Sequence, residues 1–495
     1  MYEARRKVLW FAIISRLSII FMQMIFNSLC PDHESDGFIT PKDPTINSSF
    51  ADNMINYSLS GLARWDSNYF LHIAKYGYTY ENTLAFFPLY PMSIRFLSKI
   101  IRKLFFFINE DSVFLLSGVT ISFICFVKSS IILYDLTRYI FKDKNIAYKS
   151  AILYCISPAN IFLTSVYSES MFAYFTFSGM LASMKNDPFV SLPIGLSSII
   201  RSNGLINIGY PIYIFIQEFI FFKIPNIIYE IKSHSIKSSI PSIINIIGCL
   251  LNILCTILLS FAPFCLLQTY NYVQFCTEKT NSTIIPKHVI EYGINNDLIL
   301  SGSKLSPWCT STIPIAYTYV QKKYWNVGLF NYYEIKQLPN FFLAIPIIYI
   351  MLKCTFDYCL ENKKNLFMLK FYHHNINNIN SNNRRNTRFK KYTNDMLPFV
   401  IHGLFLTIFC ILFVHIQVST RLLSSASPIL YWYCAISMSK KFTDDYDERQ
   451  NIHSKWKVFF MTQKRYTKSD KLILIYFIGY TIFGTFMFSN FLPWT

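Results

Sequence analysis

Charged side chains are scarce in this chain of 495 residues, since Asp, Glu, Lys and Arg together make up only 15% of it. Ordinary soluble domains carry about 25% charged residues. Hydrophobic residues account for 52% of the chain and aromatic residues for 18%, and the mean hydropathy is +0.30. This composition predicts a membrane protein rather than a soluble domain.

The motifs of several common enzyme classes are also missing. The sequence contains no GxxxxGK[ST], no GxGxxG after a strand, no HExxH, no GxSxG and no protein-kinase set. Its 12 cysteines are scattered and show no spacing typical of zinc. The only DxD-like string, Asp445 to Asp447, lies in a charged stretch that we expect to be a solvent-exposed surface rather than a metal site. We therefore expect no metal site.

Acidic residues are outnumbered by basic ones, with 28 Asp and Glu against 46 Lys and Arg and a net charge of +18. Nucleic-acid binding is one explanation for such a balance. Here, however, the basic residues fall mostly in short clusters between apolar runs, which is the pattern of cytosolic loops in membrane proteins. We therefore expect no nucleic-acid partner.

The apolar runs predict an all-α polytopic protein with about eleven transmembrane helices in a single multispanning domain (1–495). The first span, 8–29, follows three basic residues and lacks a cleavage site after it, so we expect it to be uncleaved with a cytosolic N-terminus. The other spans are expected at 112–134, as four broken helices within 150–222, and at 243–267, 339–353, 396–414, 421–436 and 472–491. This count places the C-terminus on the non-cytosolic side.

Two long loops are expected on the non-cytosolic side, a large first loop at 30–111 and a second loop at 268–338. Two segments are expected in the cytosol: a basic, Asn-rich, disordered insert at 357–395 and a charged loop at 437–471.

The glycosylation sequons at Asn47, Asn56 and Asn281 all fall in the two non-cytosolic loops, which agrees with this topology. Cys30, Cys276 and Cys309 fall on the same side, and the sequence leaves a disulfide among them open.

One stretch of the first loop, Gly61–Pro91, combines an Arg-Trp-Asp triplet with a His, many aromatic residues and prolines. Its charged residues would each cost several kcal/mol in hydrocarbon, so it is not a span. Its aromatic rings suit the membrane boundary, where polar groups can face a wet cavity. We predict that this stretch is the catalytic loop of a membrane enzyme.

Further polar residues at span ends fall on the same membrane face. Each has a plainer structural explanation: Asp32 and Asp66 suit helix starts, Glu169 suits a turn, and Arg201 and Arg421 suit lipid phosphate contacts. Their common location nevertheless favours a shared site. Sugar transfer from a lipid phosphate requires a carboxylate base, positive charge at the departing phosphate and aromatic surface for the substrates.

Seven sequence blocks carry a resemblance to a known family. They are the block at 64–91 (RWDSNYFLHIAKYGYTYENTLAFFPLYP) and those at 31–38, 157–173, 201–207, 324–346, 415–435 and 490–495. The chain resembles the GPI mannosyltransferase 2 family, which adds the second mannose during glycosylphosphatidylinositol (GPI) anchor assembly.

This resemblance implies a GT-C type glycosyltransferase fold in the endoplasmic reticulum membrane, with its active site facing the lumen. It implies dolichyl-phosphate mannose as the donor substrate, with no separate cofactor, and a mannosyl-glucosaminyl-phosphatidylinositol precursor as the acceptor. Since the donor is β-linked and the product is α1,6-linked, it also implies inversion in one displacement. A small accessory membrane subunit would fit the family.

We expect Asp66 to be the catalytic base, aimed at the acceptor 6-hydroxyl, with Asp32 or Glu34 as the second candidate. Arg201 and Arg421 are expected to bind the donor phosphate. The remaining candidates for phosphate or sugar binding are Arg64, His72, Glu169, Asn203 and His415.

The main alternative is a multispanning lipid or sugar transporter or scramblase, since transporters also place polar groups at broken helices. It predicts an inverted repeat and polar residues near span centres. A non-catalytic assembly subunit is a further alternative, and it would tolerate the loss of Asp66. The sequence leaves open the order of substrate binding and the modifications of the acceptor.

Overall fold

The computed structural model describes residues 2–34, 37–233, 240–277, 285–303, 305–367, 392–439 and 466–494. Its regular elements within these residues are helices, and an isolated antiparallel bridge between Tyr80 and Leu300 is the one strand-like pairing there. The all-α architecture expected from the sequence is confirmed.

Seven helical segments in the described part of the chain are long and apolar enough to cross a membrane, so the chain is a multi-pass membrane protein. They contain α1 (Tyr2–Leu29), α5 (Glu110–Phe141), α9 (Gly209–Glu218) with η4 (Phe219–Lys223) and α10 (Ile224–Ser233), α11 (Ile240–Cys276), α14 (Leu338–Phe367), α15 (Leu397–Leu412) and α19 (Lys468–Ser489).

The other four expected spans correspond to shorter helices. They are α6 (Lys144–Cys155), α7 (Glu169–Met184), α8 (Ser191–Ser198) and the pair α16 (Ser419–Ala426) and α17 (Ile429–Ser439). A helix that crosses the hydrocarbon core needs about 20 residues, and the longest of these has 16. Eleven spans therefore stay a prediction, while the breaks expected within 150–222 are present as the turns between α6, α7, α8 and α9.

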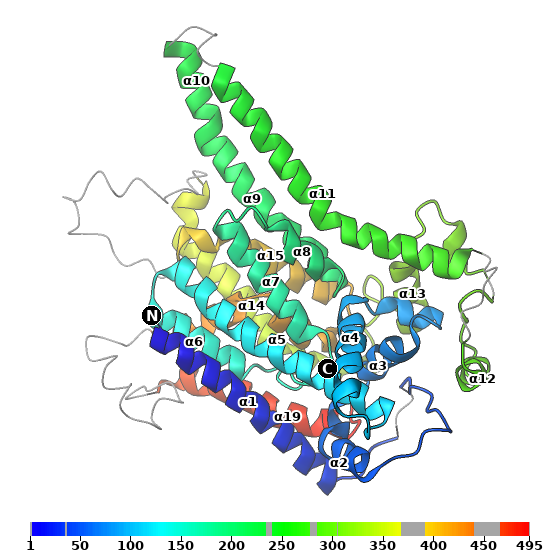
Figure 1. Cartoon of the computed structure of the whole chain (residues 1–495). Helices are drawn as coiled ribbons and strands as arrows, with labels where there is room; N and C mark the ends of the chain where they lie inside the picture. Colours follow the sequence, from blue (N-terminus) through cyan, green and yellow to red (C-terminus); the bar gives the residue numbers. More distant parts are fainter. Residues whose placement is uncertain are drawn as a thin grey trace.

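The helices form one packed bundle with α5 running through it (Figure 1). α5 contacts α1, α4 (Leu89–Leu104), α6 and α7, and α1 lies beside α19. The pair formed by α10 and the first part of α11 projects from the bundle (Figure 1). The core is rich in aromatic rings; for example, Phe126 and Tyr154 stack at 4.9 Å.

A buried arginine holds the irregular segment between α6 and α7. Arg16 of α1 is fully buried, and its guanidinium donates to the carbonyl of Cys155 at 3.0 Å and to Thr164 Oγ1 at 2.7 Å. It also donates to the carbonyl of Asn160 at 3.1 Å and lies 3.7 Å from the centre of the Phe126 ring. Backbone groups released by a helix break need such partners inside a membrane protein. Arg16 therefore fixes the segment that leads to Ser168 and Glu169.

The first and second loops pack together outside the candidate spans. The first loop forms α2 (Phe50–Leu59), η1 (Ser60–Leu62), α3 (Ser67–Tyr76), η2 (Glu81–Ala85) and α4. The second loop forms α12 (Lys287–Asn295), η6 (Pro307–Thr310), α13 (Ala316–Trp325) and η7 (Ile335–Gln337). Their shared hydrophobic cluster includes Ile73 and Leu84 from the first loop and Trp308 and Val320 from the second.

A disulfide joins Cys276, at the end of α11, to Cys309 in η6, with their Cα atoms 5.5 Å apart. Of the three cysteines that the sequence left open, these two form the bond and Cys30 is free. The disulfide anchors the second loop to a long membrane helix.

Some sequence predictions fall outside the described residues. Within the predicted insert at 357–395, α14 continues to Phe367, and residues 368–391 are not described. Most of the predicted charged loop at 437–471 is likewise not described, because the structure omits 440–465. The sequon at Asn281 also lies outside the described residues.

Candidate active site

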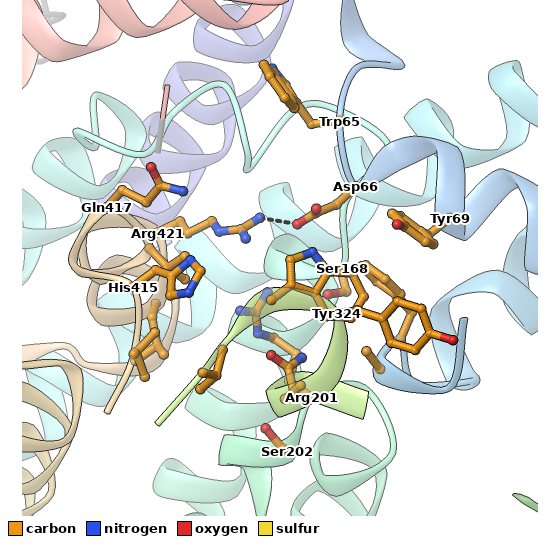
Figure 2. Close-up of a pocket in the computed structure, with 18 of the residues that line it drawn as sticks. Trp65, Asp66, Tyr69, Ser168, Arg201, Ser202, Tyr324, His415, Gln417 and Arg421 are labelled. Carbon is orange, nitrogen blue, oxygen red and sulfur yellow. Dashed lines mark hydrogen bonds and ion pairs between the residues drawn. The ribbon is translucent and has the colours of Figure 1, made fainter. Parts of the chain in front are cut away.

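A cavity of about 1080 Å³ lies where the two loops meet the broken helices and the end of α15. Asp66 and Tyr69 line it from the first loop, and Tyr324 lines it from the second. Its remaining polar lining includes Ser168, Glu169, Arg201, Ser202, Asn203, His415, Gln417 and Arg421. Segments that are far apart in the sequence therefore share one chamber (Figure 2).

Asp66 occupies the position just before α3, yet its side chain makes no capping hydrogen bond. The preceding residue, Trp65, has a φ of 53°, a left-handed conformation that costs a non-glycine residue about 1–2 kcal/mol. The backbone N–H of Asp66 donates to Tyr167 Oη at 3.1 Å. The carboxylate is thus directed into the cavity, and the helix-cap explanation is wrong.

Asp66, Arg421, Glu169 and Arg201 form an alternating chain of acidic and basic groups. Arg421 Nη1 donates to Asp66 Oδ2 at 2.6 Å and lies 3.8 Å from Glu169 Oε1. Arg201 Nη1 forms an ion pair with the same Glu169 oxygen. Figure 2 shows this contact between Arg421 and Asp66 as a dashed line. Both guanidiniums are therefore held beside a carboxylate, Arg421 beside Asp66 and Arg201 beside the buried Glu169.

Glu169 is the most enclosed member of this chain. Its side chain has no solvent exposure, and Oε2 finds no hydrogen-bond partner among the described residues. It begins α7, where the positive end of the helix dipole favours a negative charge. Such a buried carboxylate is stable only when cations neutralise it, which Arg201 and Arg421 do here.

The cavity has two different non-polar walls. One is built by the end of α15, the segment that follows it and α16, from Phe409, Phe413, Val414, Val418 and Leu422. The other is aromatic: the Tyr69 ring stacks on Phe38 at 4.4 Å and on Phe86 at 4.3 Å, and Trp325 meets Tyr69 at 5.9 Å. The charged groups lie in the same cavity as both walls, so it can accept an amphipathic ligand together with a polar one.

His415 and Gln417 complete the polar lining beside Arg421. The His415 ring stacks on Tyr332 at 4.5 Å, and Tyr332 Oη donates to Gln417 Oε1 at 3.2 Å. Burial lowers the pKa of His415 below its usual value. This imidazole is therefore neutral at neutral pH and offers a hydrogen bond rather than a charge.

Comparison with known proteins identifies the family. The model of the family described as mannosyltransferase (PIG-V) matches residues 5–495. The chain belongs to this mannosyltransferase family. A Drosophila melanogaster relative called GPI mannosyltransferase 2 is 34% identical over 99% of both chains. A Mus musculus relative called GPI alpha-1,6-mannosyltransferase 2 is 30% identical over 99% of both chains. No solved structure matches the chain.

In this mannosyltransferase, the structure places most of the predicted site residues around the cavity. Those that line it are Glu34, Asp66, Glu169, Arg201, Asn203, His415 and Arg421. Their catalytic and binding roles stay predictions, but their convergence from four separate parts of the chain is a property of the fold.

The other predicted residues, Asp32, Arg64 and His72, do not line the cavity. Arg64 pairs with Asp32 at 2.8 Å and donates to the carbonyl of Ser489 at 3.1 Å, which fastens the first loop to α19. The direct substrate contacts that we predicted for Asp32 and Arg64 have no support in this geometry.

His72 is fully buried behind the cavity wall. Its Nε2 lies 2.6 Å from Thr79 Oγ1, and its ring stacks on Tyr80 at 4.9 Å. Burial lowers the pKa of His72 to about 3, so the ring is neutral. Its position gives it a packing role, and the sugar contact that we predicted for it has no support in this geometry.

The residues that hold and shape the aromatic wall of the enzyme were not among the predicted site residues. Tyr69, Tyr324 and Trp325 line the cavity, and Glu81 binds the segment that carries the last two. All four lie within the sequence blocks that carried the family resemblance. These residues form the aromatic wall only because the two loops pack together, and local sequence patterns do not show that packing.

Proposed function

We propose that the chain transfers a mannose in α1,6 linkage from dolichyl-phosphate mannose to a GPI precursor that already carries one mannose. Membership of the mannosyltransferase family supports mannose as the transferred sugar. The name of the mouse relative supports a GPI precursor as the acceptor and an α1,6 linkage in the product. The observation that carries the mechanism is the placement of Asp66 in a cavity with two arginines.

In the proposed reaction, the Asp66 carboxylate removes the proton from the 6-hydroxyl of the acceptor mannose. The hydroxyl oxygen then attacks C1 of the donor mannose from the face opposite the phosphate. The C1–O bond to phosphate breaks, and dolichyl phosphate leaves with the bonding electron pair. A single displacement of this kind inverts the β-linked donor to an α product.

Arg201 and Arg421 would stabilise the charge that develops on the leaving phosphate. Arg421 has capacity for this in addition to its bond with Asp66, because a guanidinium has five N–H donors and its contacts with Asp66 and Glu169 both use Nη1. One guanidinium can then contact both the base and the leaving group. This arrangement would keep acceptor activation and phosphate departure within one small region of the cavity.

The two non-polar walls would separate the substrates. The apolar wall from α15 and α16 suits the first isoprenoid units of the lipid donor, next to the arginines. The aromatic wall from the two loops suits the sugar of the acceptor. We propose no metal and no cofactor in addition to these substrates.

We propose that the site faces the lumen of the endoplasmic reticulum, with a cytosolic N-terminus and a lumenal C-terminus. Two features of the loops support this. Disulfides such as Cys276–Cys309 persist in oxidising compartments. The sequons at Asn47 and Asn56 are exposed on the first loop, where a lumenal enzyme could modify them. A small accessory membrane subunit stays a prediction from the resemblance.

The transporter or scramblase alternative gains no support. The matching family is one of mannosyltransferases. In addition, Asp66, Glu169, Arg201 and Arg421 gather outside the candidate spans rather than at their centres.

The direct test is transfer by the purified full-length protein in detergent. The protein is supplied with dolichyl-phosphate mannose and a mannosyl-glucosaminyl-phosphatidylinositol acceptor, and the product is digested with a linkage-specific α1,6-mannosidase. We expect one mannose to be added and then released by that enzyme. Intact acceptor, or a product resistant to that mannosidase, would contradict the proposed reaction.

A further inference from the structure

Glu81 is a buried carboxylate that accepts hydrogen bonds from four donors. It has no solvent exposure; Oε2 accepts from Lys323 Nζ at 2.7 Å and from Tyr324 Oη at 2.9 Å. Oε1 accepts from Trp308 Nε1 at 3.2 Å and from the Ser306 hydroxyl. Hydrogen bonds to a charged group are stronger than those between neutral groups. Removal of a buried carboxylate leaves its donors without a partner, which costs free energy.

All four donors come from the second loop, whereas Glu81 lies in η2 of the first. Ser306 and Trp308 belong to the segment around η6, which the Cys276–Cys309 disulfide ties to α11. Lys323 and Tyr324 belong to the last turn of α13. Glu81 is therefore a polar joint that fixes α13 relative to the first loop, and it does not itself line the cavity.

The joint sets the position of an aromatic corner, formed by Tyr69, Phe86, Tyr324 and Trp325. Trp325 meets Tyr69 at 5.9 Å and Phe86 at 6.0 Å. All four residues line the cavity, and both Tyr324 and Trp325 are half-buried. Half-buried aromatic rings in a cavity provide apolar surface that packs against the C–H face of a sugar ring.

The position of this corner indicates which of the two substrates it binds. In Figure 2 the carboxylate of Asp66 lies between Arg421 on one side and Tyr69 on the other. The phosphate of a lipid donor requires the arginine side, and the apolar wall includes Val418 and Leu422, which neighbour Arg421 in the sequence. A hydroxyl that loses its proton to Asp66 must approach from the remaining side, where the aromatic corner is.

We propose that the aromatic corner binds a sugar ring of the acceptor glycan, and that Glu81 is the positioning residue that holds this corner in place. The inference rests on the proposed function, because it takes a glycan acceptor as given. Glu81 acts through Tyr324 and the neighbouring Trp325 and touches no reacting atom. Its loss should therefore weaken acceptor binding more than it affects the donor or the chemical step.

The test compares Glu81→Gln with Asp52→Asn in the full-length enzyme. Asp52 is a matched control because it is also a buried carboxylate of the first loop, bonded to Ser49 and to the backbone of Asn109, and does not line the cavity. Initial rates are measured while either the GPI precursor or dolichyl-phosphate mannose is varied. For Glu81→Gln we expect the acceptor KM to rise about tenfold or more, with the donor KM within about twofold of the wild-type value.

Two further variants keep the proposal testable if Glu81→Gln fails to fold. Tyr324→Phe removes one hydroxyl donor to Glu81, and Trp325→Ala removes a ring of the corner; both should raise the acceptor KM selectively. Equal acceptor KM values for Glu81→Gln and Asp52→Asn, or for Trp325→Ala and wild type, would overturn the inference. Failure of the wild-type enzyme to use this acceptor would instead overturn the proposed function.

Discussion

Arg421 Nη1 donates to Asp66 Oδ2 at 2.6 Å, although the two residues are 355 positions apart in the chain. The contact joins the first loop to α16, and the same guanidinium lies 3.8 Å from Glu169 at the start of α7. In the proposed mechanism this geometry connects the base with the phosphate site. A substitution at the base or at the phosphate site should therefore change catalysis, and the kinetic constant that changes should show which of the two was affected.

Replacement of Arg201 tests the phosphate site. Arg201→Met removes one cation and leaves Glu169 with only the more distant Arg421, so we expect the donor KM to rise about ten- to hundredfold. The control is Arg102→Met, because Arg102 forms an exposed ion pair with Glu110, of a kind that contributes little. Equal donor KM values for the two variants in a donor titration would argue against a phosphate role for Arg201.

Loss of the disulfide tests the anchoring of the second loop. The bond closes a separation of 33 residues, which corresponds to about 3–4 kcal/mol of unfolding free energy in the chain-entropy treatment. We expect Cys276→Ser and Cys309→Ser to lower the melting temperature similarly, and the double variant to add little to either. Cys30→Ser, at a free cysteine, is the control. Additive effects of the two serine variants would show that the cysteines act separately.

The buried imidazole of His72 predicts a pH dependence of stability. Its pKa falls from 6.5 to about 3 on folding, so the unfolded chain binds the extra proton in between. The contribution of His72 to the free energy of unfolding is complete above about pH 6.5 and declines as the pH falls, by about 2 kcal/mol at pH 5. Thermal unfolding of wild type and His72→Gln at pH 7 and pH 5 measures this. A decline of equal size in both proteins would assign the pH effect to other groups.

The sequons test the orientation of the first loop. Asn47 and Asn56 are exposed, with Asn56 on α2, so a lumenal loop should carry glycans there. We expect deglycosylation to increase the mobility of the wild-type protein on a gel, and Asn47→Gln with Asn56→Gln to reduce that shift. A cysteine placed in the first loop that reacts with an impermeant reagent only from the cytosol would contradict the orientation.

Much of the architecture follows from hydrophobic runs and their interruptions. The helix breaks near Ser165, Pro188 and Arg201 fall where Pro, Asn and Gly favour turns, although Pro263 and Pro346 lie inside α11 and α14. The sequence could not show that α6, α7 and α8 are too short to span a bilayer individually. The break between α6 and α7 is the segment held by Arg16, and those contacts join residues more than 100 positions apart.

The site was predictable in its residue types but not in its pairings. Polar residues at span ends on one face indicated Asp66, Glu169, Arg201 and Arg421, and all four line the cavity. The partner of each carboxylate depends on packing between distant helices, which no local pattern contains. The same limit hid Glu81, whose donors lie 225 to 243 positions away. Conversely, His72 suggested chemistry by its type alone, and burial excludes it from the cavity.

The central claim is that the Asp66 carboxylate removes a proton from the acceptor. Its most direct test is the kcat of Asp66→Asn in the purified transfer assay, with Asp32→Asn as the comparison, since Asp32 lies outside the cavity lining. We expect kcat of Asp66→Asn to fall about 10²- to 10⁴-fold while the protein stays folded, and Asp32→Asn to keep most of its activity. Wild-type turnover by a folded Asp66→Asn protein would contradict the account.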